Sequence, residues 1–369
     1  MRIGFYNPYL SALGGGERYF LTILEEAARR PGELLLFSPD EPDPAAWAQR
    51  LGISIPREAF AWVPADDGAV TQASGDLDLL VTLANDVPVL NRARRAVAVV
   101  QFPTRPRDRP SERVRAALLE AVGRARAPAA LGSYDRFVCN SQFTRAHIAR
   151  RLGVDAIVIS PPVDAPANAH APAKEPRIVA VGRFFAGEHA KRHDVLLDAF
   201  AELRRRPGAA EWTLHVAGGA DDRASTRRLL DGLRERARRL PVHLHVNAPV
   251  GELRDLYARS TLFWHAAGYG EDPQRHPERL EHFGIATAEA MMHGAVPLVV
   301  PLGGQAEVVR DGRDGRHWRT VPELVEATAA LIADPSATQR LGETARTSAQ
   351  RFAKPRFLAA VRDQVLGPG

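Results

Sequence analysis

Two glutamates, Glu281 and Glu289, stand eight positions apart in the stretch EHFGIATAEAMMHG at residues 281–294. Eight residues exceed two turns of an α-helix, so the two side chains are not an i, i+4 pair. If a helix begins near Ala286 or Thr287, Glu281 lies in the loop before it and Glu289 lies in its first turn. The two carboxylates could then face one ligand from two sides, with helix N–H groups between them. The alternative is a surface acid followed by an acid that stabilises the helix dipole.

Two basic residues bracket a loop in a second stretch, VGRFFAGEHAKRHDVLLDAF at residues 181–200. Arg183 and Lys191 could converge on a pyrophosphate, the guanidinium as a hydrogen-bonding fork and the ammonium as a point charge. Lys191 is notable because the chain otherwise uses arginine almost throughout. The alternative is that both are ordinary surface bases at a helix start. His189 and His193 flank Lys191 without a cysteine or carboxylate cluster nearby, so we expect no metal site there.

Glycine runs follow two expected strands. GGGER at residues 14–18 could bring backbone N–H groups close to a phosphate at a helix N-terminus, or could simply be a tight turn. Because Glu17 and Arg18 follow directly, the dinucleotide-binding pattern G-x-G-x-x-G is not met. In PLGGQAEVVRDG at residues 301–312, Gly303 and Gly304 either approach a ligand or only turn the chain, and we favour a mixed role.

Length and composition limit the class of protein. The chain has 369 residues, of which 45% are hydrophobic and 25% charged, as in a globular protein with two domains. No apolar run approaches about 18 residues, and the N-terminus lacks the pattern of a signal peptide. The single cysteine, Cys139, excludes an internal disulfide framework and favours a cytoplasmic location. We interpret it as a small buried residue.

Positive charge is concentrated in residues 92–126, which contain ten arginines and three acids, although the net charge of the chain is only +5. This stretch could contact anionic lipid head groups or a phosphorylated acceptor, which would place the protein at the inner face of a membrane. The alternative is a solvated helix face. Aromatic residues do not punctuate the basic run, so we expect no nucleic-acid partner.

The chain alternates short apolar runs with helical patterns, which predicts an α/β fold with parallel sheets wound on both faces. A proline- and alanine-rich segment at residues 161–177 is interpreted as a linker between two such halves. Ligands of these sheets bind at the carboxyl ends of the strands. In the first half we expect strands at residues 3–6, 34–37, 79–82, 97–100, 136–139 and 157–160, with helices at 18–30 and 113–124. In the second half we expect strands at 178–181, 213–217, 242–246, 262–265 and 296–300, with helices at 194–205, 225–239, 253–258, 286–293 and 324–333.

Several motifs together resemble one enzyme family. GRFF…KRHDVLLDAF, EHFGIATAEAM and GGQAEVV look like the donor half of retaining glycosyltransferases of family 4, and NSQFTRAHIARRLGV resembles their acceptor half. The resemblance, including an insertion before EHFG seen in bacterial members, covers nearly the whole chain. It implies the GT-B fold, in which two Rossmann-like, doubly wound parallel-sheet domains face a central cleft. We place an acceptor domain at residues 1–170, a donor domain at 171–350, and a terminal helix crossing back at 351–369.

The resemblance also implies roles for particular residues. Arg183 and Lys191 match the basic pair that holds the donor diphosphate, Glu281 matches the acid that contacts the transferred sugar, and these three are the candidate catalytic residues. Near Asn247 to Val250, the loop after an expected strand could select the base. The remaining candidate donor-binding residues implied by the family match are Gly15, Gly16, Phe283, Gly284, Ile285 and Glu289.

These matches favour a hexosyltransferase that uses a nucleoside-diphosphate sugar, with GDP-mannose as the expected donor, and a glycan or lipid-linked glycan acceptor, as in cell-envelope polysaccharide synthesis. Gln101 stands where many relatives have a histidine, and glutamine cannot act as a general base. A front-face mechanism, in which the leaving phosphate accepts the proton, therefore fits better. No metal or other cofactor is expected, and the Asp-Leu-Asp sequence at residues 76–78 is interpreted as acids at a strand start. A nucleotide-sugar epimerase and a non-catalytic nucleotide-sugar-binding protein are the alternatives.

Overall fold

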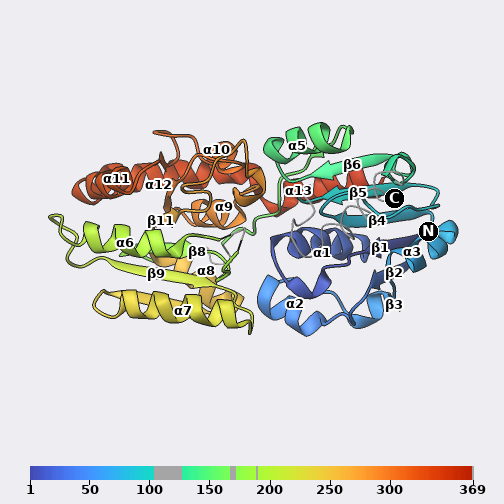
Figure 1. The fold of residues 1–369 in the computed structure, drawn as a ribbon, viewed down its shortest axis with the longest axis horizontal. Helices are drawn as coiled ribbons and strands as arrows, with labels where there is room; N and C mark the ends of the chain where they lie inside the picture. Colours follow the sequence, from blue (N-terminus) through green and yellow to red (C-terminus); the bar gives the residue numbers. More distant parts are fainter. Residues whose placement is uncertain (104–126, 167–171, 188–189, 368–369) are drawn as a thin grey trace. The chain divides into compact units, whose positions relative to one another are not determined.

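A computed structural model describes residues 1–103, 127–166, 172–187 and 190–367 of the chain. The chain forms two compact units, one made of Met1–Ser160 with Phe357–Gly369 and the other of Pro161–Arg356 (Figure 1). The helix predicted at residues 113–124 and most of the arginine-rich stretch lie outside the described residues.

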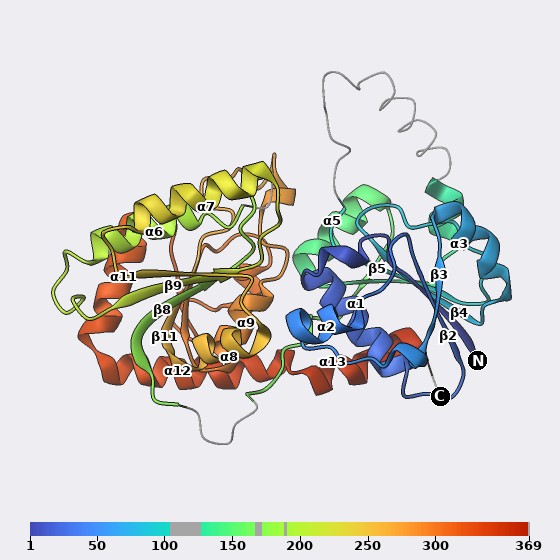
Figure 2. The same ribbon diagram turned by 90° about the horizontal axis from the view of Figure 1, so that it is seen from below.

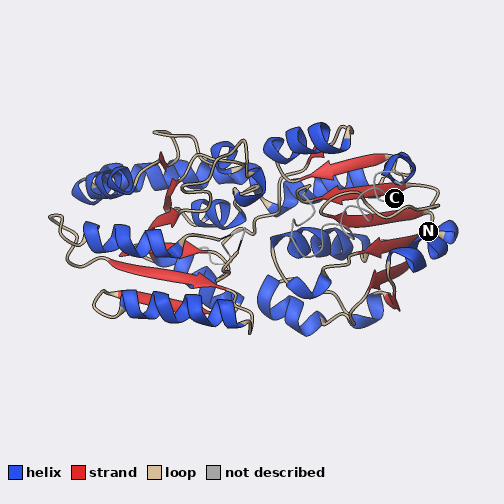
Figure 3. Cartoon of the chain, viewed as in Figure 1, coloured by secondary structure: helices blue, strands red, loops and turns tan. Residues whose placement is uncertain are grey.

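The described part of the first unit contains a sheet of seven parallel strands in the order β3-β2-β1-β4-β5-β6-β7. Figure 3 draws the strands in red. All six strands predicted in this half are confirmed, with ends that move by one or two residues. β3 was missed because it is a short, partly exposed edge strand that ends in a proline. The strands are β1 (Arg2–Tyr6), β2 (Glu33–Ser38), β3 (Ala61–Pro64), β4 (Leu79–Ala84), β5 (Ala96–Val100), β6 (Arg136–Cys139) and β7 (Ile157–Val158).

Helices cover both faces of this sheet, so the predicted doubly wound arrangement is confirmed (Figure 2). The core on one face includes side chains of α1, α2 and α13, where the Tyr19 ring meets Phe357 edge to face at 4.8 Å and its hydroxyl donates to the carbonyl of Ile159. The core on the other face includes Val70 of α3 and Ile148 of α5. The helices are α1 (Gly15–Ala27), α2 (Pro44–Leu51), α3 (Asp67–Ala73), α5 (Gln142–Leu152) and α13 (Lys354–Val361).

The described part of the second unit contains six parallel strands in the order β10-β9-β8-β11-β12-β13. The five strands predicted in this half are confirmed, whereas the two-residue β13 was missed. The strands are β8 (Glu175–Val181), β9 (Thr213–Gly218), β10 (Val242–Val246), β11 (Ser260–His265), β12 (Val296–Val299) and β13 (Arg316–His317).

Helices again lie on both faces of the second sheet. Figure 2 shows α6 and α7 on one side of β8 and β9 and α8, α9 and α12 on the other. The helices are α6 (His193–Leu203), α7 (Ala224–Ala237), α8 (Val250–Arg259), α9 (Ile285–Met292), α10 (Gln305–Val308), α11 (Val321–Ala333) and α12 (Pro335–Ala349). Of these, α10 and α12 were not predicted.

The interpretation of residues 161–177 as a linker was too broad. Strand β8 already begins at Glu175. At the other end of the segment, Val163 is fully buried and exchanges two backbone hydrogen bonds of 2.9 Å, donating to the carbonyl of Phe352 and accepting from the amide of Lys354. Proline and alanine content pointed to a linker, but backbone pairing with a distant segment decided the outcome.

Two glycines let the turns after β8 and β9 meet. A Cβ atom on Gly218, the last residue of β9, would lie 2.0 Å from the carbonyl oxygen of Gly182. A Cβ on Gly182 would lie 2.6 Å from Cγ of Lys191. Residues with side chains do not fit at these positions, so the glycines fix how closely the loop that carries Arg183 and Lys191 can pack.

A matched pair of Gly→Ala variants tests this packing. Gly218→Ala should destabilise the protein by roughly 1–3 kcal/mol, because the added methyl group overlaps a backbone carbonyl. Gly232→Ala should instead stabilise it by about 0.5–1 kcal/mol, because Gly232 lies inside helix α7 and an added Cβ meets no atom within 4 Å. Urea denaturation measures both values. Equal effects at the two positions would contradict the close approach at Gly218.

Candidate active site

Functional side chains of the second unit come from segments that are far apart in the sequence. Strand β8 leads into the loop that carries Arg183 and Lys191, and β11 ends at His265. Glu281 lies in the loop between β11 and α9. Because β8 and β11 are parallel neighbours in the sheet, their carboxyl ends lie at the same edge.

Lys191 and His265 both bind the carboxylate of Glu281. The Nζ atom of Lys191 lies 2.6 Å from Glu281 Oε2, and Nε2 of His265 lies 3.0 Å from the same oxygen. The side chains are largely buried, with exposed fractions of 22% for Lys191, 17% for Glu281 and 4% for His265. The described residues form no hydrogen bond to the second oxygen, Oε1, so it is able to accept one from a ligand.

The charges of this group follow from its surroundings. Burial alone raises the pKa of Glu281, but the Lys191 ammonium and the hydrogen bond from His265 outweigh it and hold that pKa well below its usual range. Burial lowers the pKa of His265, and the Lys191 charge adds to this although Glu281 opposes it. At neutral pH the site therefore contains an ionised Glu281 and a neutral His265. An ionised carboxylate only accepts, so Nε2 of His265 must carry the proton.

The glycine pair after β12 positions the loop of Glu281. The amide of Gly304 donates to the carbonyl of Glu281 at 2.7 Å, and Gly303 has a φ of +64°. Cβ atoms on Gly303 and Gly304 would lie 2.2 Å from the Glu281 carbonyl oxygen and 2.3 Å from that of His282. These two glycines are therefore needed so that the chain after β12 can pack against the backbone of the loop that carries Glu281.

Helix α9 begins at Ile285, one residue before the predicted start, and this corrects one expectation. Glu289 is its fifth residue and lies in the second turn, not the first. Its Oε2 accepts a hydrogen bond of 3.0 Å from the Tyr257 hydroxyl. Gly284 is the N-cap, with a φ of +105°, and buried Phe283 before it packs edge to face on Phe352. The first amides of α9 lack intrahelical acceptors, as in any helix, and lie just beyond Glu281.

The side chains of Arg183 and Lys191 do not contact each other. Lys191 reaches Glu281, whereas Arg183 is exposed and forms no hydrogen bond within the described residues. His193 is buried, and its Nε2 lies 3.1 Å from the carbonyl oxygen of Gly182; burial lowers its pKa to about 4. The other histidine of this loop, His189, lies outside the described residues.

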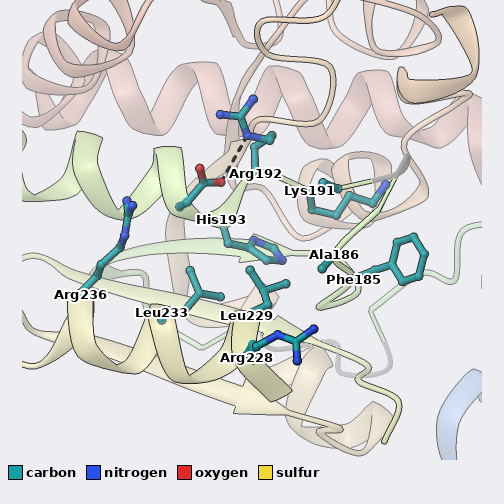
Figure 4. Close-up of a pocket in the computed structure, with 12 residues that line it drawn as sticks. Phe185, Ala186, Lys191, Arg192, His193, Arg228, Leu229, Leu233 and Arg236 are labelled. Atoms are coloured by element: carbon teal, nitrogen blue, oxygen red, sulfur yellow. Dashed lines mark hydrogen bonds and ion pairs between the residues drawn. The ribbon is translucent and has the colours of Figure 1, made fainter. Parts of the chain in front are cut away.

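The loop before α6 also forms one wall of a cavity. Figure 4 shows Lys191, Arg192 and His193 on one side and Leu229 and Leu233 of α7 on the other. The cavity has a volume of about 360 Å³. The side chain of Lys191 therefore has open space beside it.

Asn247 has a structural task that the sequence did not show. It adopts the left-handed conformation, with a φ of +57°. Its Oδ1 accepts from the amide of Ala220 at 2.9 Å, and its Nδ2 donates to the carbonyl of the same residue at 3.3 Å. Asn247 thus ties together the loops after β9 and β10. Val250 is the first residue of α8, and selection of a base by this loop stays a prediction.

The candidate glycines of the first unit open helix α1. Gly15 and Gly16 are its first two residues, so the helix starts three residues before the predicted position. The amide of Gly14 donates to Glu17 Oε2 at 2.7 Å, which closes a capping box. A Cβ on Gly16 would lie 3.3 Å from Cγ of Gln101, so this glycine allows the helix start to lie beside Gln101.

Other sequence features have structural explanations. Asp78 Oδ2 accepts from the amide of Arg2 at 2.8 Å, so this acid, which directly precedes β4, is bonded to the first residue of β1. Asp78 also forms an ion pair with Arg94. Cys139 is fully buried in β6. Among the described residues, no group of three or more histidine, cysteine or acidic side chains could hold a metal ion. No helix in the described part is long and apolar enough to cross a membrane.

Two family models match the chain. "Glycosyltransferase Family 4" covers residues 13–165, and "Glycosyl transferases group 1" covers residues 164–348. The chain belongs to the glycosyl transferases group 1 family and is a glycosyltransferase of the GT-B fold.

Relatives and solved structures agree with this assignment. The "GDP-Man:Man(3)GlcNAc(2)-PP-Dol alpha-1,2-mannosyltransferase" of Dictyostelium discoideum is 25% identical over 248 residues, which cover 62% of this chain and 46% of that protein. The Xenopus tropicalis protein of the same name is 26% identical over 242 residues, or 61% of this chain and 47% of that protein. The chain therefore matches slightly less than half the length of these curated relatives.

Solved structures with low sequence identity share the fold. A glycosyltransferase from Rickettsia africae has a TM-score of 0.69 at 15% identity and covers 100% of this chain and 99% of its own. Anabaena HepE, in complex with UDP, has a TM-score of 0.70 at 17% identity and covers 98% of both chains. At this identity the likeness concerns the fold alone.

The lowered pKa of Glu281 leads to a prediction about acid stability. A carboxyl whose pKa is lower in the folded than in the unfolded state stabilises the fold above its unfolded pKa of about 4.3, and this contribution is lost as the pH falls toward the folded-state value. We expect the difference in unfolding free energy between wild-type protein and Glu281→Gln to be largest above about pH 5 and to shrink below about pH 4. Urea denaturation at a series of pH values measures this difference.

The Lys191→Met background is the control. The Lys191 ammonium lowers the pKa of Glu281, so without it the Glu281→Gln difference should lose most of its dependence on pH. A flat difference in the wild-type background would contradict the lowered pKa.

Proposed function

We propose that this glycosyltransferase transfers a hexose from a nucleoside-diphosphate sugar to a hydroxyl group of a glycan, with retention of anomeric configuration. The observation that carries the proposal is the ionised, largely buried Glu281, with Oε2 held by Lys191 and His265 and Oε1 able to accept from a sugar hydroxyl. GDP-mannose is the proposed donor, because the curated relatives are named as GDP-mannose-dependent mannosyltransferases.

The donor would be held by groups of the second unit. Lys191 and exposed Arg183 would bind the diphosphate, together with the first amides of α9 at Gly284 and Ile285. Glu289 would accept from the ribose hydroxyls, and its hydrogen bond from Tyr257 would orient it for this. Glu281 would bind the hexose.

The proposed chemistry needs no enzyme nucleophile. The bond between the anomeric carbon and the diphosphate oxygen breaks, and the acceptor oxygen bonds to the same face of that carbon. The acceptor proton passes to the departing phosphate oxygen. The protein positions the reactants and stabilises negative charge on the leaving group through Lys191, Arg183 and the helix amides.

The proposed mechanism is independent of metal ions, because positively charged and amide groups would take the role of a cation at the diphosphate. Turnover that persists in excess EDTA would agree with this. Loss of turnover in EDTA and recovery with manganese would contradict it.

The proposed acceptor is a lipid-linked glycan, as named for the curated relatives. Contact of the arginine-rich stretch with anionic lipid would bring the enzyme to such an acceptor, and the release of protein from anionic vesicles by salt tests this contact. Because those relatives come from Dictyostelium and Xenopus, the resemblance to bacterial enzymes and a role in the cell envelope stay predictions.

The donor is identified by ligand-dependent stability. A nucleotide or nucleotide sugar at about 100 times its dissociation constant should stabilise the protein by about 2.7 kcal/mol. Thermal unfolding with UDP, GDP, ADP and their sugars compares the candidates, and the largest shift should come with GDP and GDP-mannose. A larger shift with a uridine or adenosine nucleotide would contradict the proposed donor.

Basic-residue variants test the role of the diphosphate site. Lys191→Ala and Arg183→Ala should each lower kcat about a hundred- to a thousandfold, because each removes a preorganised positive charge that would stabilise the negative leaving group. Release of nucleoside diphosphate measures the rate, and Arg238→Ala on the exposed end of α7 is the control. Unchanged kinetics in both variants would remove the diphosphate assignment. Conversion of the donor sugar to an isomer without an acceptor would instead indicate an epimerase.

A further inference from the structure

His265 lies where a side chain has little freedom to move. It is the last residue of β11, a strand with neighbours on both sides in the sheet, and its imidazole is almost fully buried. The ring is stacked over that of Phe263 on the same strand. Within the described residues, its Nε2 meets Glu281 Oε2 and its Nδ1 has no hydrogen-bond partner.

Lys191 binds the same oxygen, Glu281 Oε2, but its side chain is more flexible than the buried ring of His265. Lys191 lies on a loop, has a flexible four-carbon stem, and borders an open cavity. The proposed function requires this ammonium to reach the diphosphate. When the Lys191 ammonium binds the diphosphate, its ion pair with Glu281 is shared or lost. Without a second hydrogen-bond donor, the Glu281 carboxylate could then rotate away from the sugar.

We infer that His265 is a positioning residue that holds Oε2 of Glu281 through its Nε2–H, so that Oε1 stays directed at the transferred sugar when Lys191 binds the diphosphate. This inference rests on the proposed function and adds to it a residue that neither the sequence motifs nor the family match singled out. His265 itself would touch neither the donor nor the acceptor.

The charged and titratable groups around His265 fit this role. Lys191 and His193 face it from the loop before α6 and from the start of that helix, and Glu281 faces it from the loop before α9. Since Lys191 already supplies one positive charge, a neutral imidazole fixes the carboxylate by a hydrogen bond without placing a second buried cation beside the first. Glu281 is the group that fixes which ring nitrogen carries the proton.

Two substitutions separate the hydrogen bond from packing. In His265→Gln the amide nitrogen can take the place of Nε2, because both nitrogens lie three bonds beyond Cβ; His265→Leu fills a similar space without a donor. We expect kcat to fall about ten- to a hundredfold in His265→Leu, as for loss of a hydrogen bond to a charged group. The KM for the donor should stay within a factor of about three, and His265→Gln should recover most of the lost rate.

The pH profile gives a readout that a purely structural role would not change. Without the Nε2–H donor, the pKa of Glu281 rises, so the acid limb of kcat/KM should move to higher pH in His265→Leu and return in His265→Gln. Normal kcat and an unshifted acid limb in His265→Leu would overturn the inference. A His265→Gln variant that is stably folded but as slow as His265→Leu would also overturn it, because the ring and not its donor would then matter.

A measurement on resting wild-type protein separates this inference from the proposed function. In ¹⁵N-histidine NMR spectra, the signals missing from His265→Gln identify His265. We expect the Nε2–H tautomer, uncharged throughout the neutral range. An Nδ1–H tautomer, or ordinary titration near pH 6.5, would end the inference even if the enzyme transfers sugar. Absence of turnover with every nucleotide sugar would end the proposed function even if the tautomer is as expected.

Discussion

The candidate site depends on the ion pair between Lys191 and Glu281. Two opposite charges that are mostly shielded from water need each other, since removing one leaves the other uncompensated at a cost of several kcal/mol. The pair is also the place where the loop before α6 meets the loop before α9. His265 adds a neutral donor to the same oxygen, so the carboxylate is held from two directions and remains ionised.

Close backbone contacts make this pair possible. Gly182 and Gly218 let the turns after two neighbouring strands meet, and Gly303 and Gly304 let the chain after β12 lie against the loop of Glu281. In each case a single added Cβ would overlap a backbone carbonyl or a site residue's side chain. The glycines therefore act on the site through the backbone, by setting where the charged side chains begin.

The family assignment and the geometry answer different questions. The family matches give the class of enzyme and the fold, while the distances show which side chains form one group. The surroundings then decide what each group can do. A neutral histidine and an ionised glutamate are stable neighbours here because burial disfavours a charge on the imidazole, whereas the lysine favours one on the carboxylate.

Much of the fold could be read from local patterns. Apolar runs separated by helical periodicity gave the strands of both sheets, and errors fell on short or edge elements such as β3 and β13, where few side chains are buried. The start of α1 was misplaced because its N-cap is a glycine, whose role becomes visible only when Glu17 is seen to accept from its amide. For His265 one signal was present, since a histidine ended a predicted strand where ligands of such sheets bind.

The sequence by itself determined the alternation of strands and helices, the family, and the identity of Glu281 and Lys191 as candidates, because these depend on residue type and local spacing. Only the tertiary structure decided that Lys191 pairs with Glu281, 90 residues away, and not with Arg183, that His265 joins them, and that Asn247 is occupied with Ala220. The reason is that a hydrogen bond depends on distance and direction. Those are set by how parallel strands bring distant segments to one edge, and local spacing does not contain that information.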